Sequence, residues 1–302
     1  MPVGGAIAEY EIVAEGDLLG ESPFWSSTEQ ALYWVDMLGR RIRRLFPGSG
    51  VTEAWPAPGW PTSLALCRTS GAIVGLNNAV TAFDFHGRFK KLCVPEPGQI
   101  DQRLNEGCCD PRGRLWVGSM KNNIARDGRV IQTTESAGFL YCVDTDCSVQ
   151  RTCEDAFGIP NTMIWTQEGT FLIGDSLSEQ IYIYDYLDTS NRIVHRRPFS
   201  KTKAPGVPDG SAMDCEGGIW NARYGGSCLV RFSPQGEIDR IITLPSINPT
   251  SCAFGGPVLE TLFVTTASVG LPSGSLAHPS AQGAVLAIHP GVRGLPSRTF
   301  AG

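Results

Sequence analysis

Short runs of alternating hydrophobic and polar residues, separated by turn signals, extend along the whole chain. Residues 31–36, 170–175 and 261–266 are typical examples: each is rich in strand-forming side chains and follows a polar or Gly-containing turn. No segment keeps the period of about 3.6 residues that marks an amphipathic helix. This pattern predicts an all-β protein.

The strand pattern repeats six times. The copies begin near residues 21, 62, 105, 161, 209 and 250, at intervals of 41, 43, 56, 48 and 41 residues. Each copy holds three strand-like runs, and we expect a fourth before the next copy begins. Repeats of this length are typical of propeller blades, which bury both faces only by stacking in a closed ring.

The sequence therefore predicts that residues 1–302 form a single six-bladed β-propeller domain, with four-stranded antiparallel blades around a central channel. The strand near residues 10–14 is expected to complete the last blade and close the ring. A β-sandwich of similar strand content is the alternative fold, and the regular repeat disfavours it.

Composition narrows the possible classes of protein. Of the 302 residues, 42% are hydrophobic and 18% are charged, and the net charge is −5, so a large core and no nucleic-acid partner are expected. No run of about 18 apolar residues and no signal-peptide pattern is present. The ten cysteines are scattered without a CxxC pair. We therefore expect a cytoplasmic protein with reduced thiols and no membrane partner.

A hydrogen-bonding residue opens the first strand of every copy. These lead residues are Glu21, Thr62, Asn105, Asn161, Asp209 and Thr250. Since the innermost strands of a propeller line its channel, we expect the lead residues to converge at one mouth. Glu21, Asn161 and Asp209 are hard oxygen donors, and together they predict a site for one divalent cation (Ca²⁺, Zn²⁺, Mn²⁺, Mg²⁺ or Fe²⁺). Taken alone, an Asp before Gly is more typical of a turn.

Several short motifs follow one another in the order found in a known family. They are Gly20-Glu21-Ser22-Pro23, Arg103-Leu104-Asn105-Glu106-Gly107, the segment 110–120, Pro160-Asn161, the segment 181–186 and Pro208-Asp209-Gly210. From about residue 9 to residue 292, the chain resembles the SMP-30/gluconolactonase/regucalcin-like family. Its C-terminal part is more similar to bacterial sugar lactonases, such as arabinono- and xylonolactonases, than to animal members. The resemblance implies a propeller that binds a divalent cation in its channel and hydrolyses sugar lactones.

Position by position, the resemblance implies that Glu21, Asn161 and Asp209 are the metal ligands. It also implies that Asp209 is the catalytic acid and base, and that Arg103 and Asn105 bind the substrate. The alternatives to a substrate-binding role are that Arg103 is an ordinary surface cation and that Asn105 is a turn residue.

This chain departs from the family pattern at a few positions. Glu106, which we also expect to contact the substrate, stands where the family usually has Asp, and Cys108 stands where it usually has Lys. Animal members have a substrate-contacting Glu in the region where this chain reads Lys121-Asn122-Asn123. These differences bear on substrate geometry and leave the predicted ligand set intact.

The predicted function is that of a carboxylic-ester hydrolase, a metal-dependent lactonase. It is expected to hydrolyse a sugar (aldono) lactone, a pentono- or hexonolactone, to the open aldonic acid. The chain has no GxSxG motif for a serine nucleophile, so a metal ion is expected to assist the reaction. Two alternatives stay open: a metal-dependent esterase or phosphotriesterase on the same scaffold, and a non-catalytic calcium-binding propeller. The loop 270–282 is a candidate lid, and we expect a monomer or small homo-oligomer.

Overall fold

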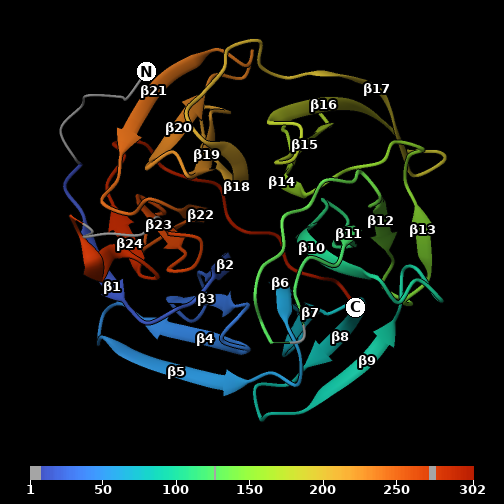
Figure 1. Ribbon diagram of the computed structural model, residues 1–302, viewed down its shortest axis with the longest axis horizontal. Helices are drawn as coiled ribbons and strands as arrows, with labels where there is room; N and C mark the ends of the chain where they lie inside the picture. The colour runs from blue at the N-terminus through green and yellow to red at the C-terminus, as the bar shows by residue number, and fades with distance from the viewer. Residues whose placement is uncertain (1–7, 126, 272–276) are drawn as a thin grey trace.

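A ring of six four-stranded antiparallel sheets surrounds a central channel in the computed structural model of the protein (Figure 1). The structure describes residues 8–125, 127–271 and 277–302, so part of the candidate lid 270–282 lies outside it. The prediction of a six-bladed propeller is confirmed. None of the helices in the described ranges is both long enough and apolar enough to cross a membrane.

The first three blades follow one another along the chain, each built from the channel outwards. Blade 1 consists of β2 (Gly20–Ser26), β3 (Ala31–Asp36), β4 (Arg41–Phe46) and β5 (Val51–Pro56). Blade 2 consists of β6 (Pro61–Leu66), β7 (Ala72–Leu76), β8 (Ala79–Phe83) and β9 (Phe89–Cys93). Blade 3 consists of β10 (Gln102–Cys109), β11 (Leu115–Lys121), β12 (Leu140–Val143) and β13 (Val149–Arg151).

The other three blades complete the ring. Blade 4 consists of β14 (Pro160–Trp165), β15 (Thr170–Asp175), β16 (Gln180–Leu187) and β17 (Arg192–Pro198). Blade 5 consists of β18 (Val207–Met213), β19 (Ile219–Tyr224), β20 (Cys228–Phe232) and β21 (Ile238–Thr243). Blade 6 consists of β22 (Pro249–Gly255), β23 (Thr261–Thr266), β24 (Val285–Ile288) and β1 (Glu11–Ala14), with the short 3-10 helix η1 (Pro279–Ala281) before β24.

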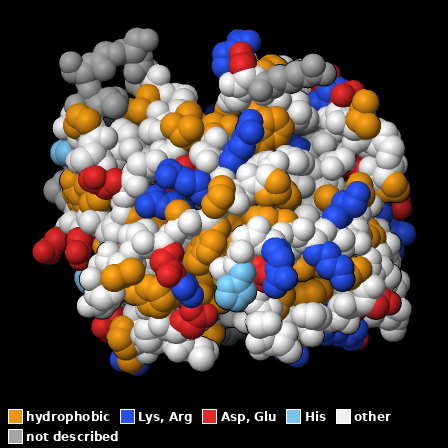
Figure 2. Space-filling view, turned by 90° about the horizontal axis from the view of Figure 1, so that it is seen from below, with side chains coloured by type: hydrophobic (Ala, Val, Ile, Leu, Met, Phe, Trp, Pro, Cys, Tyr) orange, Lys and Arg blue, Asp and Glu red, His pale blue; other side chains and the backbone are white. Residues whose placement is uncertain are grey.

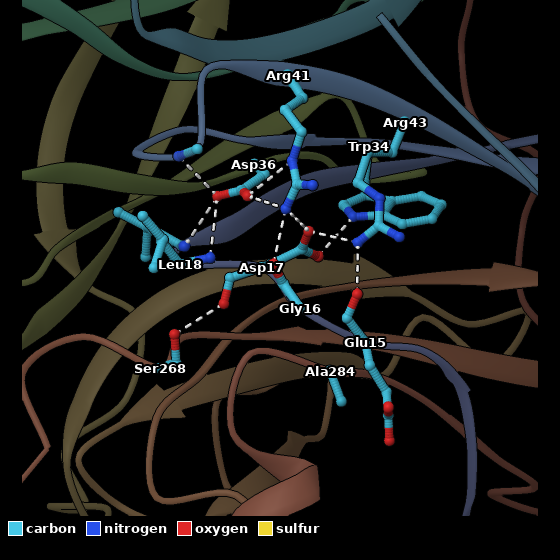
Figure 3. A network of polar contacts seen from close by, with 12 residues as sticks. Glu15, Gly16, Asp17, Leu18, Trp34, Asp36, Arg41, Arg43, Ser268 and Ala284 are labelled. Carbon is cyan, nitrogen blue, oxygen red and sulfur yellow. Dashed lines mark hydrogen bonds and ion pairs between the residues drawn. The ribbon is translucent and has the colours of Figure 1, made fainter. Parts of the chain in front are cut away.

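The ring closes in blade 6, where the first strand of the chain, β1, pairs antiparallel with the last strand, β24, and Ile12 lies opposite Leu286. The joint between blades 6 and 1 is held by a buried polar network around Asp17 (Figure 3). The Asp17 carboxylate accepts hydrogen bonds from Trp34 Nε1 at 2.7 Å and Arg43 Nη1 at 2.5 Å. Its carbonyl oxygen accepts a 2.8 Å hydrogen bond from the Ser268 hydroxyl in the segment after β23. One residue therefore links both sides of the joint.

Every innermost strand carries an irregularity beside its lead residue. The register shifts lie between Glu21 and Phe24 in β2, Pro61 and Ser63 in β6, Leu104 and Gly107 in β10, Asn161 and Ile164 in β14, Pro208 and Ser211 in β18, and Pro249 and Ser251 in β22. A β-bulge bends its strand and re-aims the side chains on it. The same irregularity therefore recurs at the start of all six innermost strands, although the hydroxyls of two lead residues, Thr62 and Thr250, donate to the carbonyl oxygens of Gly75 and Gly20.

The last residues of the chain cross the far end of the channel, as the red segment at the centre of Figure 1 shows. They donate hydrogen bonds to the carbonyl oxygens of the final residues of three innermost strands. The Leu295 N–H donates to Met213, the Arg298 guanidinium to Trp165, and the Phe300 N–H to Leu66. Between this segment and the strands lies a cavity of about 180 Å³. Residues 295–298 therefore line this cavity at the end of the channel where the innermost strands finish.

The outer surface agrees with the charge pattern of the sequence. On the side of the ring drawn in Figure 2, Lys and Arg side chains alternate with Asp and Glu, without a continuous basic stripe on that face. The ten cysteines are all free, and five of them are buried. Four others are half-buried and Cys215 is exposed, so the prediction of buried thiols holds for half of the cysteines.

Candidate active site at the channel mouth

Two carboxylates, Glu21 of blade 1 and Asp209 of blade 5, lie close enough at the channel mouth to interact electrostatically. Burial raises the pKa of Glu21 well above its ordinary value, and the nearby carboxylates of Asp209 and Glu106 raise it further. Burial also raises the pKa of Asp209, and Glu106 adds to the effect. Like charges this close oppose each other's ionisation, so a cation bound among them would stabilise the ionised carboxylates.

The third predicted ligand, Asn161, is the second residue of β14 and is buried, with 5% of its surface exposed. Its Oδ1 accepts a 2.9 Å hydrogen bond from Asn105 Nδ2, and its Nδ2 donates to Ser176 Oγ at 2.8 Å. Both sides of the amide are thus held. The next residue, Thr162, has φ of 49°, in the left-handed region that marks the bulge and is uncommon for a residue other than glycine.

The backbone that carries Asp209 is anchored by its neighbours on both sides of the ring. The carbonyl oxygen of Asp209 accepts hydrogen bonds from the Thr162 hydroxyl and, at 3.0 Å, from Asn221 Nδ2. The preceding carbonyl, of Pro208, accepts from Ser176 Oγ at 2.6 Å. Gly210 is required by close packing, since a Cβ there would lie 2.0 Å from Ser251 Oγ. Blades 4 and 5 are therefore fixed relative to each other at the mouth.

Arg103 is buried at the mouth and is not the surface cation that its residue type suggests. Its Nη1 donates to Asn105 Oδ1 at 2.7 Å and to the Leu104 carbonyl, while Nε and Nη2 donate to Asn123 Oδ1 at 3.0 and 2.8 Å. Burial lowers the pKa of Arg103 to about 10, and Glu21 opposes this shift. The side chain is therefore cationic at neutral pH, and one of its five N–H groups has no partner among the described residues.

Glu106 lies deeper, on the wall of the cavity below the mouth. The backbone N–H of Gly107 donates to its carboxylate at 3.0 Å, and burial raises the pKa of Glu106 to about 7. Burial raises the pKa values of the half-buried Cys108 thiol and the buried Cys252 thiol, and the Glu106 carboxylate adds to both shifts. Glu106 thus stands between the carboxylate pair and the cavity, and its predicted contact with the substrate stays a prediction.

Two residues at the end of β19 belong to the site although the sequence did not single them out. Arg223 lies opposite Pro208 in the β18–β19 ladder and donates to the carbonyl oxygens of Pro205 and Gly206, both at 2.8 Å. Burial lowers the pKa of Arg223 to about 10. Burial, together with the two carboxylates at the mouth, raises the pKa of Tyr224 to about 12. The sequence signal that could have identified this part of the site is the pair Asn221 and Arg223, two polar residues that alternate with apolar ones in β19.

The donor set at the mouth fits a hard divalent cation. It offers two carboxylates, from Glu21 and Asp209, and one amide oxygen, from Asn161, and oxygen donors of this kind suit Ca²⁺, Mg²⁺ and Mn²⁺. Within the described ranges, no group of three or more His, Cys, Asp or Glu side chains is arranged to hold a metal ion. The candidate set differs from such groups because its third member is an amide.

Comparison with known proteins places the chain in a family. Residues 19–268 match the family model described as the SMP-30/Gluconolactonase/LRE-like region. The chain is 30% identical to 6-deoxy-6-sulfogluconolactonase of Pseudomonas putida, over 96% of this chain and 98% of that protein. It is 32% identical to L-arabinolactonase of Azospirillum brasilense, over 94% and 92% of the two chains.

A solved structure agrees with this relationship. The calcium-binding protein regucalcin of Agrobacterium tumefaciens superposes with a TM-score of 0.85, at 25% identity and with 97% of each chain covered. The match to the family model runs from blade 1 to β23 of blade 6, and the superposition covers 97% of this chain. The chain therefore belongs to the SMP-30/gluconolactonase/LRE-like family.

Proposed function

We propose that this protein is a divalent-metal-dependent lactonase that opens a sugar (aldono) lactone, such as a pentono- or hexonolactone, to its aldonic acid. The observation that carries the proposal is the grouping of Glu21, Asp209 and the Asn161 amide oxygen at one channel mouth, beside the Arg103 guanidinium. Relatives named as lactonases of sulfogluconate and arabinose type support the choice of substrate class.

In this proposal, Glu21, Asn161 and Asp209 hold the ion. A bound divalent ion supplies Lewis-acid polarisation of the lactone carbonyl and lowers the pKa of water. The Asp209 carboxylate accepts a proton from the water that attacks the carbonyl carbon. As the bond between that carbon and the ring oxygen breaks, Asp209 returns the proton to the ring oxygen. The products are a hydroxyl group and a carboxylic acid, which ionises and releases a proton to the solvent.

The remaining groups at the mouth have binding roles. The unpartnered N–H of Arg103 and the polar face of Asn105 hold sugar hydroxyls, and the Arg103 charge opposes the negative charge that develops on the carbonyl oxygen. In this proposal the substrate enters at the mouth, because its binding groups lie there, while residues 295–298 line the cavity at the far end. A cytoplasmic location and a monomeric or small homo-oligomeric state complete the proposal.

The test follows the proton released on hydrolysis. Pentono- and hexonolactones are supplied to the chelator-treated protein and to protein reloaded with Ca²⁺, Mg²⁺, Mn²⁺, Zn²⁺ or Fe²⁺, and the fall in pH is recorded. Metal-restored turnover of at least one sugar lactone is expected. Turnover of aryl esters or organophosphates in place of lactones would favour the esterase alternative, and binding of Ca²⁺ without any turnover would favour the non-catalytic propeller.

A further inference from the structure

A chain of hydrogen bonds runs across the mouth from blade 3 to blade 5. Arg103 Nη1 donates to Asn105 Oδ1 at 2.7 Å, and Asn105 Nδ2 donates to Asn161 Oδ1 at 2.9 Å. Asn161 Nδ2 then donates to Ser176 Oγ at 2.8 Å. The chain ends where Ser176 Oγ donates to the Pro208 carbonyl at 2.6 Å.

The two ends of the chain fix its direction. A guanidinium can only donate, so the Arg103 end forces the Asn105 oxygen toward Arg103 and the Asn105 NH₂ group toward blade 4. There Nδ2 of Asn105 also donates to the Pro160 carbonyl at 2.9 Å, which accepts only. At the other end, the Pro208 carbonyl accepts only, so the single hydroxyl proton of Ser176 is committed to it.

The direction of the chain sets the orientation of the Asn161 amide. Since the Ser176 proton points at Pro208, the Ser176 oxygen must accept, and only the NH₂ side of Asn161 can satisfy it. The amide oxygen of Asn161 is then turned toward Asn105 and the channel. In the opposite orientation, NH₂ would face the carboxylates and repel any cation held there. The hydrogen bond that the Asn161 NH₂ group donates to Ser176 also shifts electron density toward the amide oxygen, which makes that oxygen a better ligand for a cation.

We propose that Ser176 is a positioning residue that locks Asn161 in its metal-binding orientation and ties it to the backbone beside Asp209. Ser176 lies in the turn between β15 and β16, where no sequence motif singled it out. It has no contact with the substrate in this account and acts only through Asn161 and the Pro208 carbonyl. This inference rests on the proposed function, because it assumes a divalent ion among Glu21, Asn161 and Asp209.

Metal affinity, measured without any substrate, tests the proposal. Chelator-treated wild type, Ser176→Ala, Ser176→Thr and Ser178→Ala are titrated calorimetrically with Mn²⁺ and with Ca²⁺. Removal of a partner that orients a metal ligand typically weakens metal binding about 10- to 100-fold, and this loss is expected for Ser176→Ala. Ser176→Thr keeps the hydroxyl and should bind within about threefold of wild type. Ser178 is an exposed serine of the same turn that bonds to Asp175 and Tyr182 instead, so Ser178→Ala should match wild type.

A second background separates orientation from general damage to the turn. Asn161→Asp has no NH₂ group, so in this background Ser176 can act only through the Pro208 carbonyl. In a double-mutant cycle, the loss caused by Ser176→Ala should therefore be clearly smaller in the Asn161→Asp background than in wild type. The thermal midpoints of all the metal-free variants are recorded to show that they are folded, and the kcat of Ser176→Ala alone should return to within about threefold of wild type at saturating metal.

Three results would overturn the proposal. They are Ser176→Ala binding metal within twofold of wild type, Ser178→Ala losing as much affinity as Ser176→Ala, and an equal loss from Ser176→Ala in both backgrounds. If the wild-type protein binds no divalent ion at all, the proposed function fails together with this inference. If wild type binds the ion and turns over lactones while Ser176→Ala is unaffected, only the inference fails.

Discussion

Asn221 Nδ2 donates a 3.0 Å hydrogen bond to the carbonyl oxygen of Asp209, and both residues are buried. Through this bond the second strand of blade 5 holds the first strand at the point where its carboxylate enters the mouth. Asn221→Ala should lower the free energy of unfolding by about 1–3 kcal/mol, because buried polar groups lose a partner. Urea unfolding of the metal-free protein measures the effect, and a variant as stable as wild type would show that Thr162 alone holds this carbonyl.

Asp209→Asn tests proton transfer at the mouth. The change keeps the shape of the side chain and one oxygen donor, but it removes the group that accepts the proton. A fall in kcat of about 10²- to 10⁴-fold is expected when the metal content, determined separately, equals that of wild type. Asp188→Asn, in an exposed ion pair with Arg112, serves as the control. Full activity of a metal-loaded Asp209→Asn protein would exclude the acid–base role.

Glu106 should make the stability of the metal-free protein depend on pH. Its pKa rises from 4.5 to about 7 on folding because the carboxyl is buried. Below pH 4.5 the group is protonated in both states, so it costs nothing. Between pH 4.5 and 7 the unfolded chain ionises first, and stability falls with rising pH by about 2–3 kcal/mol, allowing for partial exposure of the side chain. Above pH 7 the loss levels off.

Glu106→Gln isolates this contribution, since the amide does not titrate. The difference in unfolding free energy between wild type and Glu106→Gln, measured in urea with a chelator from pH 4 to pH 8, should change in favour of the variant as the pH rises. A difference that stays constant over this range would mean that Glu106 titrates normally.

The joint between blades 6 and 1 should fail when Arg43 is replaced. Arg43→Met keeps an apolar stem over Trp34 but leaves the buried Asp17 carboxylate without its nearest cation. Loss of one partner of a buried pair costs about 3–5 kcal/mol, and the lower end is expected because Trp34 still donates to Asp17. Arg88→Met, at an exposed pair, should cost less than about 1 kcal/mol. Equal losses in the two variants, measured by thermal unfolding, would contradict a special role for the joint.

The sequence predicted the ring because the blade repeat is local. Each turn and strand is read from neighbouring residues, and the lead residues stand at the same point of every copy. Because of this regularity, Glu21, Asn161 and Asp209 could be predicted together as one set of metal ligands. Their environment, in which burial and neighbouring carboxylates raise the pKa values of both acids, depends on residues from three blades and is visible only in the fold.

The rest of the site escaped prediction because it depends on contacts between blades. Ser176 is an ordinary turn serine until its neighbours in space are known, and Asn123 is one of several polar residues after β11. Arg223 carries no motif, and only its pairing opposite Pro208 places it at the mouth. The crossing of the far end by residues 295–300 likewise follows from packing, because that segment has no strand pattern of its own.

The pairing of β1 with β24 affects the order in which the blades can fold during synthesis. Residues 11–14 leave the ribosome long before their partners at 285–288. Blades 1 to 5 have all their strands in sequence order and can form as the nascent chain grows, but β1 keeps an unpaired edge until β24 has been made. Because this pairing has a very high sequence separation, ring closure is the step most exposed to misassembly. A chaperone that binds extended apolar segments would be expected to act on residues 11–14 before any other part of the ring.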